Sequence, residues 1–107
     1  MDRLSGHLVR GVVETTCVID RVEPDGEAVV VEYSVGPEYL RYIALKGPVC
    51  VDGVSLTVIA KTSRSFSVSL VQHTQRHTNL MLRKVGDRAN LETDLVARYV
   101  EQLLVGR

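Results

Sequence analysis

Four side chains that could take part in chemistry lie close together between residues 46 and 57. Lys46 is a cation, Asp52 is a carboxylate, and Ser55 and Thr57 carry hydroxyls. The pair Asp52-Gly53 is a strong hairpin signal, because glycine accepts a positive φ and aspartate bonds its own backbone. After this turn the sequence alternates, and one apolar set is expected to face a core: Val54, Leu56, Val58 and Ala60. The two hydroxyls then lie on the outer face of a sheet, which could hold a polar small molecule.

A plainer explanation of this hairpin competes with a binding surface. Asp-Gly pairs are common as simple turns, and serine and threonine are ordinary on the solvated face of a strand. Elsewhere, His73 and His77 lie in a polar segment where solvated side chains are expected. A basic cluster is expected to form only a hydrated rim: Arg76, Arg83, Lys84 and Arg88. The spacing alone leaves both explanations of the hairpin open.

The composition predicts one globular domain without a strong electrostatic field. Of the 107 residues, 45% are hydrophobic and 24% charged, and 13 basic residues balance 13 acidic ones. A zero net charge gives no attraction to nucleic acid or to an anionic membrane, and the chain has no tryptophan and one phenylalanine for stacking on bases. No secretory or membrane-spanning pattern is present, so we expect a cytoplasmic protein.

The two cysteines lack the surroundings of a metal site. Cys17 and Cys50 both lie in apolar, strand-like segments, and no Cys/His spacing is typical of zinc. The chain also has no glycine-rich phosphate loop. We therefore expect buried free thiols and no zinc site.

Strand patterns dominate residues 1–93. Alternating and β-branched residues predict strands over 7–19, 29–35, 65–71 and 88–93, and a hairpin over 49–62. About six short strands separated by turns favour an all-β fold, a closed antiparallel barrel that leaves no exposed edge.

The segments between these strands carry turn and helix signals. Residues 23–26 predict a turn, and Pro37 predicts the first position of a short helix over 37–43. Residues 72–80 are polar and predict a loop or a helical turn.

The end of the chain has a helical pattern. Asp94 suits a helix N-cap, and apolar residues recur at helical spacing: Leu95, Val96, Tyr99, Val100, Leu103 and Leu104. We divide the domain into a barrel over 1–93 and an oligomerisation helix over 94–107. The alternative is that this helix covers its own barrel.

Several pieces of the sequence together resemble riboflavin synthase, and specifically its C-terminal barrel. The order and intervals match across nearly the whole chain. The matching pieces are residues 6–11 (GHLVRG), 42–47 (YIALKG), 52–58 (DGVSLTV), His73-Thr74, 78–80 (TNL) and 85–92 (VGDRANLE).

The resemblance implies a fold, a reaction and partners. It implies a Greek-key barrel of six antiparallel strands and an activity without cofactor or metal. Two molecules of 6,7-dimethyl-8-ribityllumazine exchange a four-carbon unit, giving riboflavin and a ribitylamino-pyrimidinedione. Members of the family carry two similar barrels and a helix that helps to form a trimer. The active site lies between an N-terminal-type barrel and a C-terminal-type barrel, and each barrel binds one lumazine.

The resemblance also implies roles for individual residues. Thr57, Val71 and Thr74 match positions that hold the pteridine ring, and Lys46 and Asp52 match positions near the ribityl chain or the reacting ring. Ser55 matches the polar residue against the reacting ring. The other barrel type carries a cysteine there, so Ser55 supports the C-terminal type. His7 matches a histidine implicated in proton handling. The predicted catalytic residues are thus Ser55, Asp52 and His7.

Two departures keep a second function in view. Val12 stands where the family usually has a second histidine, and the family's first barrel has no counterpart in this sequence. We therefore expect weak activity from the chain alone, and pairing with an N-terminal-type barrel or a second copy. The alternative is a non-catalytic lumazine- or flavin-binding protein of the same fold. A nucleic-acid-binding module is a third possibility, which the charge balance disfavours.

Overall fold

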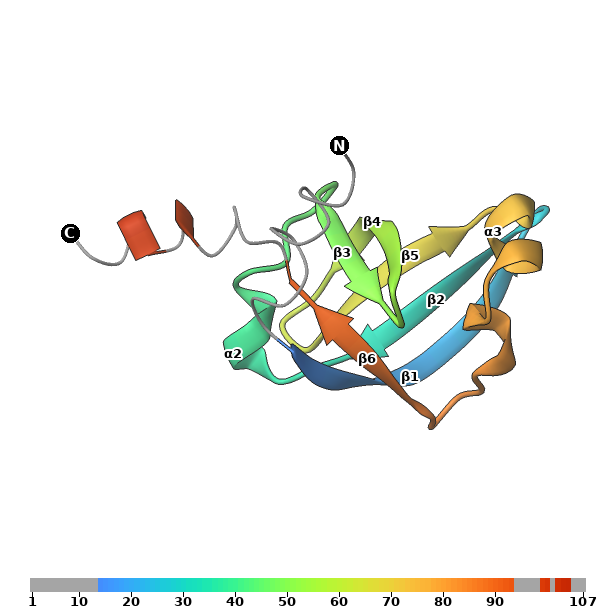
Figure 1. Ribbon diagram of the computed structural model, residues 1–107, viewed down its shortest axis with the longest axis horizontal. Helices are drawn as coiled ribbons and strands as arrows, with labels where there is room; N and C mark the ends of the chain where they lie inside the picture. Colours follow the sequence, from blue (N-terminus) through green and yellow to red (C-terminus); the bar gives the residue numbers. More distant parts are fainter. Residues whose placement is uncertain (1–13, 94–98, 101, 105–107) are drawn as a thin grey trace.

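The computed structural model describes residues 14–93, 99–100 and 102–104, and six strands form its body (Figure 1). The strands are β1 (Glu14–Asp25), β2 (Ala28–Ser34), β3 (Pro48–Val51), β4 (Val54–Lys61), β5 (Ser65–Leu70) and β6 (Arg88–Glu92). Three short helical segments connect them: α2 (Pro37–Leu40), α3 (Gln72–His77) and the 3-10 turn η1 (Leu80–Leu82).

The strands close into an antiparallel barrel in the order β1-β2-β5-β4-β3-β6. Strands β3, β4 and β5 follow one another as hairpins, and β5 then pairs with the earlier strand β2. This arrangement is a Greek key. The ring closes where β6 pairs with β1 on one side and β3 on the other. The fold predicted from the sequence, a six-stranded Greek-key barrel, is confirmed.

Alternate residues of each strand point into the barrel and form its core. On β2 the buried residues are Val31 and Tyr33, as the alternation predicts, and Tyr33 stacks on Phe66 of β5 with ring centroids 5.3 Å apart. Leu80 of η1 is also buried and belongs to the same cluster.

Two register shifts change the predicted faces. In β4 the pairing with β5 shifts between Val58 and Ala60, so Ala60 is exposed, and its predicted inward position is wrong. A β-bulge adds one residue on one strand and reverses the faces beyond it. A second shift lies in β1, between Ile19 and Arg21.

Several element boundaries also differ from the sequence prediction. The predicted turn at 23–26 is instead strand as far as Asp25, and the chain reverses at Gly26 with φ +63°. Pro24 fits in β1 because this end of β1 pairs with β2 alone among the described strands. The predicted helix over 37–43 ends at Leu40. The polar segment 72–80 becomes α3 and the start of η1.

Residues 99–100 and 102–104 are helical, in agreement with the pattern at the end of the chain. Their apolar side chains are exposed: Tyr99, Val100, Leu103 and Leu104. The rest of the predicted helix lies outside the described residues, and the oligomerisation role stays a prediction.

Candidate functional site

The outer face of β4 places Ser55 and Thr57 in solvent, as predicted. Leu56, between the two, and Val58, after Thr57, are buried, and Val54 is half-buried. The alternation of a β-strand, with successive side chains on opposite faces, produces this arrangement. Neither hydroxyl bonds to another residue in the described part of the chain, so both are free to meet a ligand.

The turn before β4 has the expected hairpin chemistry. Asp52 and Gly53 both have positive φ, +49° and +82°, as the mirror-image turns that match strand twist require. Aspartate tolerates this conformation, and at Gly53 no Cβ is present to strain it. This turn fixes the register that sends Ser55 outward, opposite Cys50 of β3.

The Asp52 carboxylate is engaged by neighbouring elements. It accepts hydrogen bonds from the backbone N–H of Asn90 (2.9 Å) and from Nε and Nη2 of Arg83 (2.9 and 3.3 Å). The Asp52 N–H in turn donates to the Asn90 carbonyl at 2.9 Å. Its side chain is only 6% exposed. The hydrogen bonds to Asp52 raise the pKa of the Arg83 guanidinium. Asp52 therefore ties the β3–β4 turn to β6.

Lys46 lies beyond the other end of the same hairpin. Its N–H donates to the Val58 carbonyl at 2.7 Å, and its φ is +66°. Val54 to Val58 is four strand steps, or about 13 Å of β4. Lys46 and Asp52 thus flank the hydroxyl-bearing face from opposite ends, and do not lie together. The Lys46 ammonium is exposed.

The end of β5 and the start of α3 supply the remaining predicted residues. Val71 is the residue before α3 and is 56% exposed, and Thr74 is half-buried one turn along that helix. The β4–β5 pairing runs from Lys61↔Phe66 to Val58↔Val68. The same register, continued, places Thr57 opposite Ser69.

Three residues near the predicted site were missed or misjudged from the sequence. Ser69 is half-buried on the outer side of β5. It lies two residues before Val71, on the same strand face, and this spacing was the signal that could have identified it. Arg83 was expected on a hydrated rim, but it pairs with Asp52. Asn90 contributes through its backbone, which no side-chain pattern reveals. His7 lies outside the described residues.

Two hollows in the described part of the surface lie apart from Ser55 and Thr57. One of about 440 Å³ adjoins the Asp52 end, lined by Thr15, Asp52, Gly53, Asn79, Arg83, Asn90, Leu91 and Glu92. Another of about 520 Å³ is lined by Thr16, Val18, Ser34, Val35, Gly36, Pro37, Ser63, Arg64 and Arg88. Ser55 and Thr57 line neither. Because ligand sites are usually concave, a ligand on this open face would need a second wall.

Neither cysteine forms a disulfide and both are buried, as predicted. Burial, and to a smaller extent the charge of Asp52, raises the pKa of the Cys17 thiol to about 12. A thiol that stays protonated is a poor nucleophile and a poor metal ligand. Among the described residues, no group of three or more histidine, cysteine or acidic side chains could hold a metal ion. No helix in that part of the chain is long and apolar enough to cross a membrane.

Residues 10–94 match the family model of the lumazine binding domain. This chain belongs to the lumazine-binding domain family. The relatives of this chain include riboflavin synthases. The chain is 42% identical to the riboflavin synthase of Mycobacterium bovis over 105 residues, which cover 95% of this chain and 52% of the relative. It is 39% identical to the riboflavin synthase of Actinobacillus pleuropneumoniae over 103 residues, which cover 96% of this chain and 48% of the relative. The chain spans about half the length of these curated relatives.

Solved structures show the same fold for this lumazine-binding domain. LumP complexed with riboflavin matches with a TM-score of 0.68 and 20% identity, over 83% of this chain and 45% of that chain. LumP complexed with flavin mononucleotide matches with a TM-score of 0.69 and 19% identity, over 87% and 49%. These likenesses confirm the barrel architecture.

Proposed function

We propose that this chain is a riboflavin synthase barrel of the C-terminal type. Its role is to bind one 6,7-dimethyl-8-ribityllumazine and to form one half of a catalytic site. The observation that carries the proposal is the open, hydroxyl-bearing face of β4, in a chain up to 42% identical to the riboflavin synthases compared above. LumP, which has the same fold, has been solved with the same lumazine.

The reaction moves four carbons from one lumazine to another. One lumazine loses a proton from its C7 methyl group, and the other is attacked at C7 by a nucleophile or an activated water. The products are riboflavin and 5-amino-6-ribitylamino-pyrimidinedione, so no external oxidant is required. Holding both substrates in the right orientation supplies much of the rate, because effective molarities of oriented pairs reach about 10⁵ M or more.

Each predicted residue has a place in this scheme. Thr57, Val71 and Thr74 hold the pteridine ring, and Lys46 meets the ribityl chain. Ser55 lies against the reacting ring, where its hydroxyl can bond to the attacking group or to a ring nitrogen.

Asp52 and His7 complete the proposed catalytic set. With its carboxylate bonded to Arg83 and Asn90, Asp52 serves the site by holding the turn from which Ser55 projects. His7 is proposed to move protons.

The second barrel is the missing wall of the site. We propose that an N-terminal-type barrel, or a second copy of this chain, covers the β4 face and brings its own lumazine. The helix at the end of the chain is proposed to hold such an assembly together as a trimer.

Titration with riboflavin tests the binding site. Flavin fluorescence should be quenched as the chain is added, and Thr57→Val should weaken binding about tenfold because one hydrogen bond is lost. Thr16→Val is the matched control, since Thr16 is an exposed threonine of β1 that lines the second hollow. Equal weakening by both variants, or no quenching by folded protein, would count against the β4 face.

A non-catalytic lumazine- or flavin-binding protein is the second candidate function. Val12, in place of the second histidine of the family, favours it. Riboflavin formation from the lumazine distinguishes the two: binding without product, even after an N-terminal-type barrel is added, would establish the second candidate.

A further inference from the structure

The helix α3 is fixed to the barrel along one side. The Gln75 side chain donates from Nε2 to the carbonyls of Leu70 (2.7 Å) and Glu27 (3.1 Å). At the end of the helix, the Thr78 hydroxyl donates to the Thr74 carbonyl at 2.7 Å. These bonds hold a six-residue helix that would be unstable alone.

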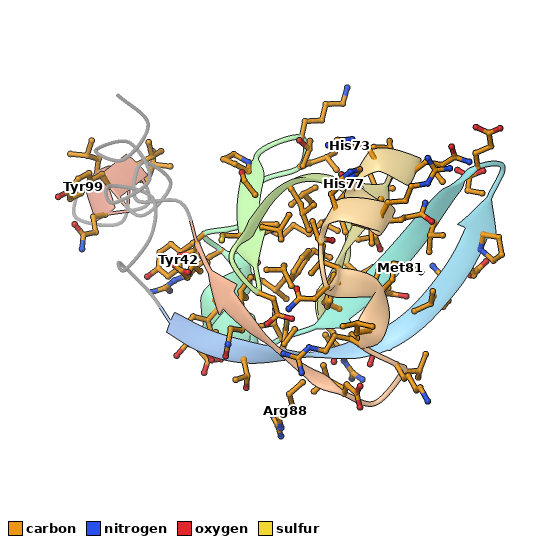
Figure 2. The ribbon with its side chains drawn as sticks, turned by 45° about the vertical axis from the view of Figure 1, so that its right-hand side comes forward. Tyr42, His73, His77, Met81, Arg88 and Tyr99 are labelled. Carbon is orange, nitrogen blue, oxygen red and sulfur yellow. The ribbon has the colours of Figure 1, made fainter. Side chains whose placement is uncertain are left out.

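Two histidines share a face of this helix. His73 and His77 are one turn apart and both exposed, and Figure 2 shows them together on α3. Their rings stack with centroids 4.2 Å apart and an interplanar angle of 22°. Side chains four residues apart on a helix are neighbours, so backbone geometry itself places these rings together.

A hydrogen bond fixes the tautomer of the neutral His77 ring. Its Nδ1 lies 2.9 Å from the His73 carbonyl oxygen, which can only accept a hydrogen bond. In the neutral ring Nδ1 therefore carries the proton, and the lone pair is on Nε2. Metal-binding histidines typically donate their second ring nitrogen to a backbone carbonyl or carboxylate in this way.

We propose that His73 and His77 form a two-histidine chelate for a divalent transition metal ion of borderline softness, such as Ni²⁺, Cu²⁺ or Zn²⁺. Imidazole suits these ions, whereas Mg²⁺ and Ca²⁺ prefer oxygen ligands. Both Nε2 atoms bind the ion, and water completes its coordination. The stacked rings hold their Nε2 lone pairs in nearly parallel planes, so at least one ring must turn through a large angle before both lone pairs meet at one ion, and exposed side chains can do so. The proposal is independent of the proposed enzymatic function.

Calorimetric titration of the whole chain with aqueous Ni²⁺, in a non-chelating buffer, tests the chelate. His73→Gln and His77→Gln should each weaken binding by about 10²-fold, because the second ligand of a chelate binds at a high effective concentration. The double variant should bind more weakly than either single variant, because each single variant keeps one imidazole that can bind the ion. Arg76→Gln, on the same helix, is the matched control and should keep the affinity.

The third histidine provides a second control. His7→Gln should leave the Ni²⁺ affinity unchanged if His73 and His77 alone bind the ion. Absence of binding up to about 1 mM Ni²⁺ would overturn the proposal. It would also fail if either single variant on α3 kept the wild-type affinity, since one histidine would then suffice. Far-UV circular dichroism confirms that each variant is folded.

Discussion

The outer faces of β4 and β5 carry similar small polar residues, but only the face of β4 is open. Ser55 and Thr57 on β4 are exposed, whereas Ser65 and Ser67 on β5 are 4% and 6% exposed. The Ser65 hydroxyl donates to Glu32 at 2.6 Å and lies 2.8 Å from the Thr62 hydroxyl.

Hydrogen bonding accounts for part of this difference. Glu32 of β2, which accepts from the Ser65 hydroxyl, also pairs with Arg21 of β1 (Nε–Oε1 3.2 Å). The Ser65 hydroxyl is thus engaged by neighbouring side chains, while the Ser55 and Thr57 hydroxyls of β4 remain available. Alternation shows which residues share a face, but neighbouring strands decide whether that face is open.

Covering the open face of β4 with a second barrel should have the largest effect, on the rate of riboflavin formation. Addition of an N-terminal-type barrel should raise the rate of riboflavin formation by about 10²-fold or more over the chain alone, because two oriented substrates then meet away from water. The increase in riboflavin absorbance with time measures this rate. If the chain alone formed riboflavin as fast as a two-barrel synthase, the open face of β4 would not limit the rate.

The Val12→His variant sharpens the same measurement. Loss of one acid–base group typically lowers the rate by about 10² to 10⁴, so restoring an imidazole should recover part of that factor once the N-terminal-type barrel is bound. A rate unchanged by Val12→His in the assembled pair would exclude a proton-transfer role for this position.

The braced turn at the start of β4 should give the next largest effect. Asp52→Ala leaves the Asn90 N–H and the Arg83 guanidinium without their acceptor, so the free energy of unfolding should fall by about 1–3 kcal/mol. Asp25→Ala is the matched control, since Asp25 is exposed beside the turn of β1 and β2. Urea denaturation measures both. Equal losses would mean that the contacts to β6 add nothing beyond turn propensity.

A pair of serine substitutions tests the comparison directly. Ser65→Ala should cost about 1–2 kcal/mol of unfolding free energy, because Glu32 and Thr62 lose a buried partner. Ser55→Ala should change stability by less than about 0.5 kcal/mol but weaken riboflavin binding. The opposite pattern would contradict the assignment of β4 as the binding face.

The barrel could be predicted from the sequence, because alternation and turn residues are local signals. Val31, Tyr33 and Phe66 face inward as the pattern requires. Two features could not be predicted. The bulge that exposes Ala60 depends on pairing with β5, and the Asp52–Arg83 pair joins residues 31 apart in the sequence. Ser55 and Thr57 were placed correctly since they lie before the bulge.

Ionisation of Cys17, inside the barrel, should have the smallest effect on stability, and only at alkaline pH. The Cys17 thiol is about 1% exposed, with its pKa raised from 9.0 to about 12 by burial, whereas in the unfolded chain it ionises near pH 9. Its contribution to stability is therefore complete below pH 9 and is lost as the pH rises toward 12, by about 1 kcal/mol at pH 10. Burial also raises the pKa of Tyr33, so some alkaline loss will persist in a Cys17→Ala variant. Denaturant unfolding at pH 8 and pH 10 should show a smaller loss for Cys17→Ala than for the wild type. Identical losses would mean that this thiol ionises as readily inside the barrel as outside it.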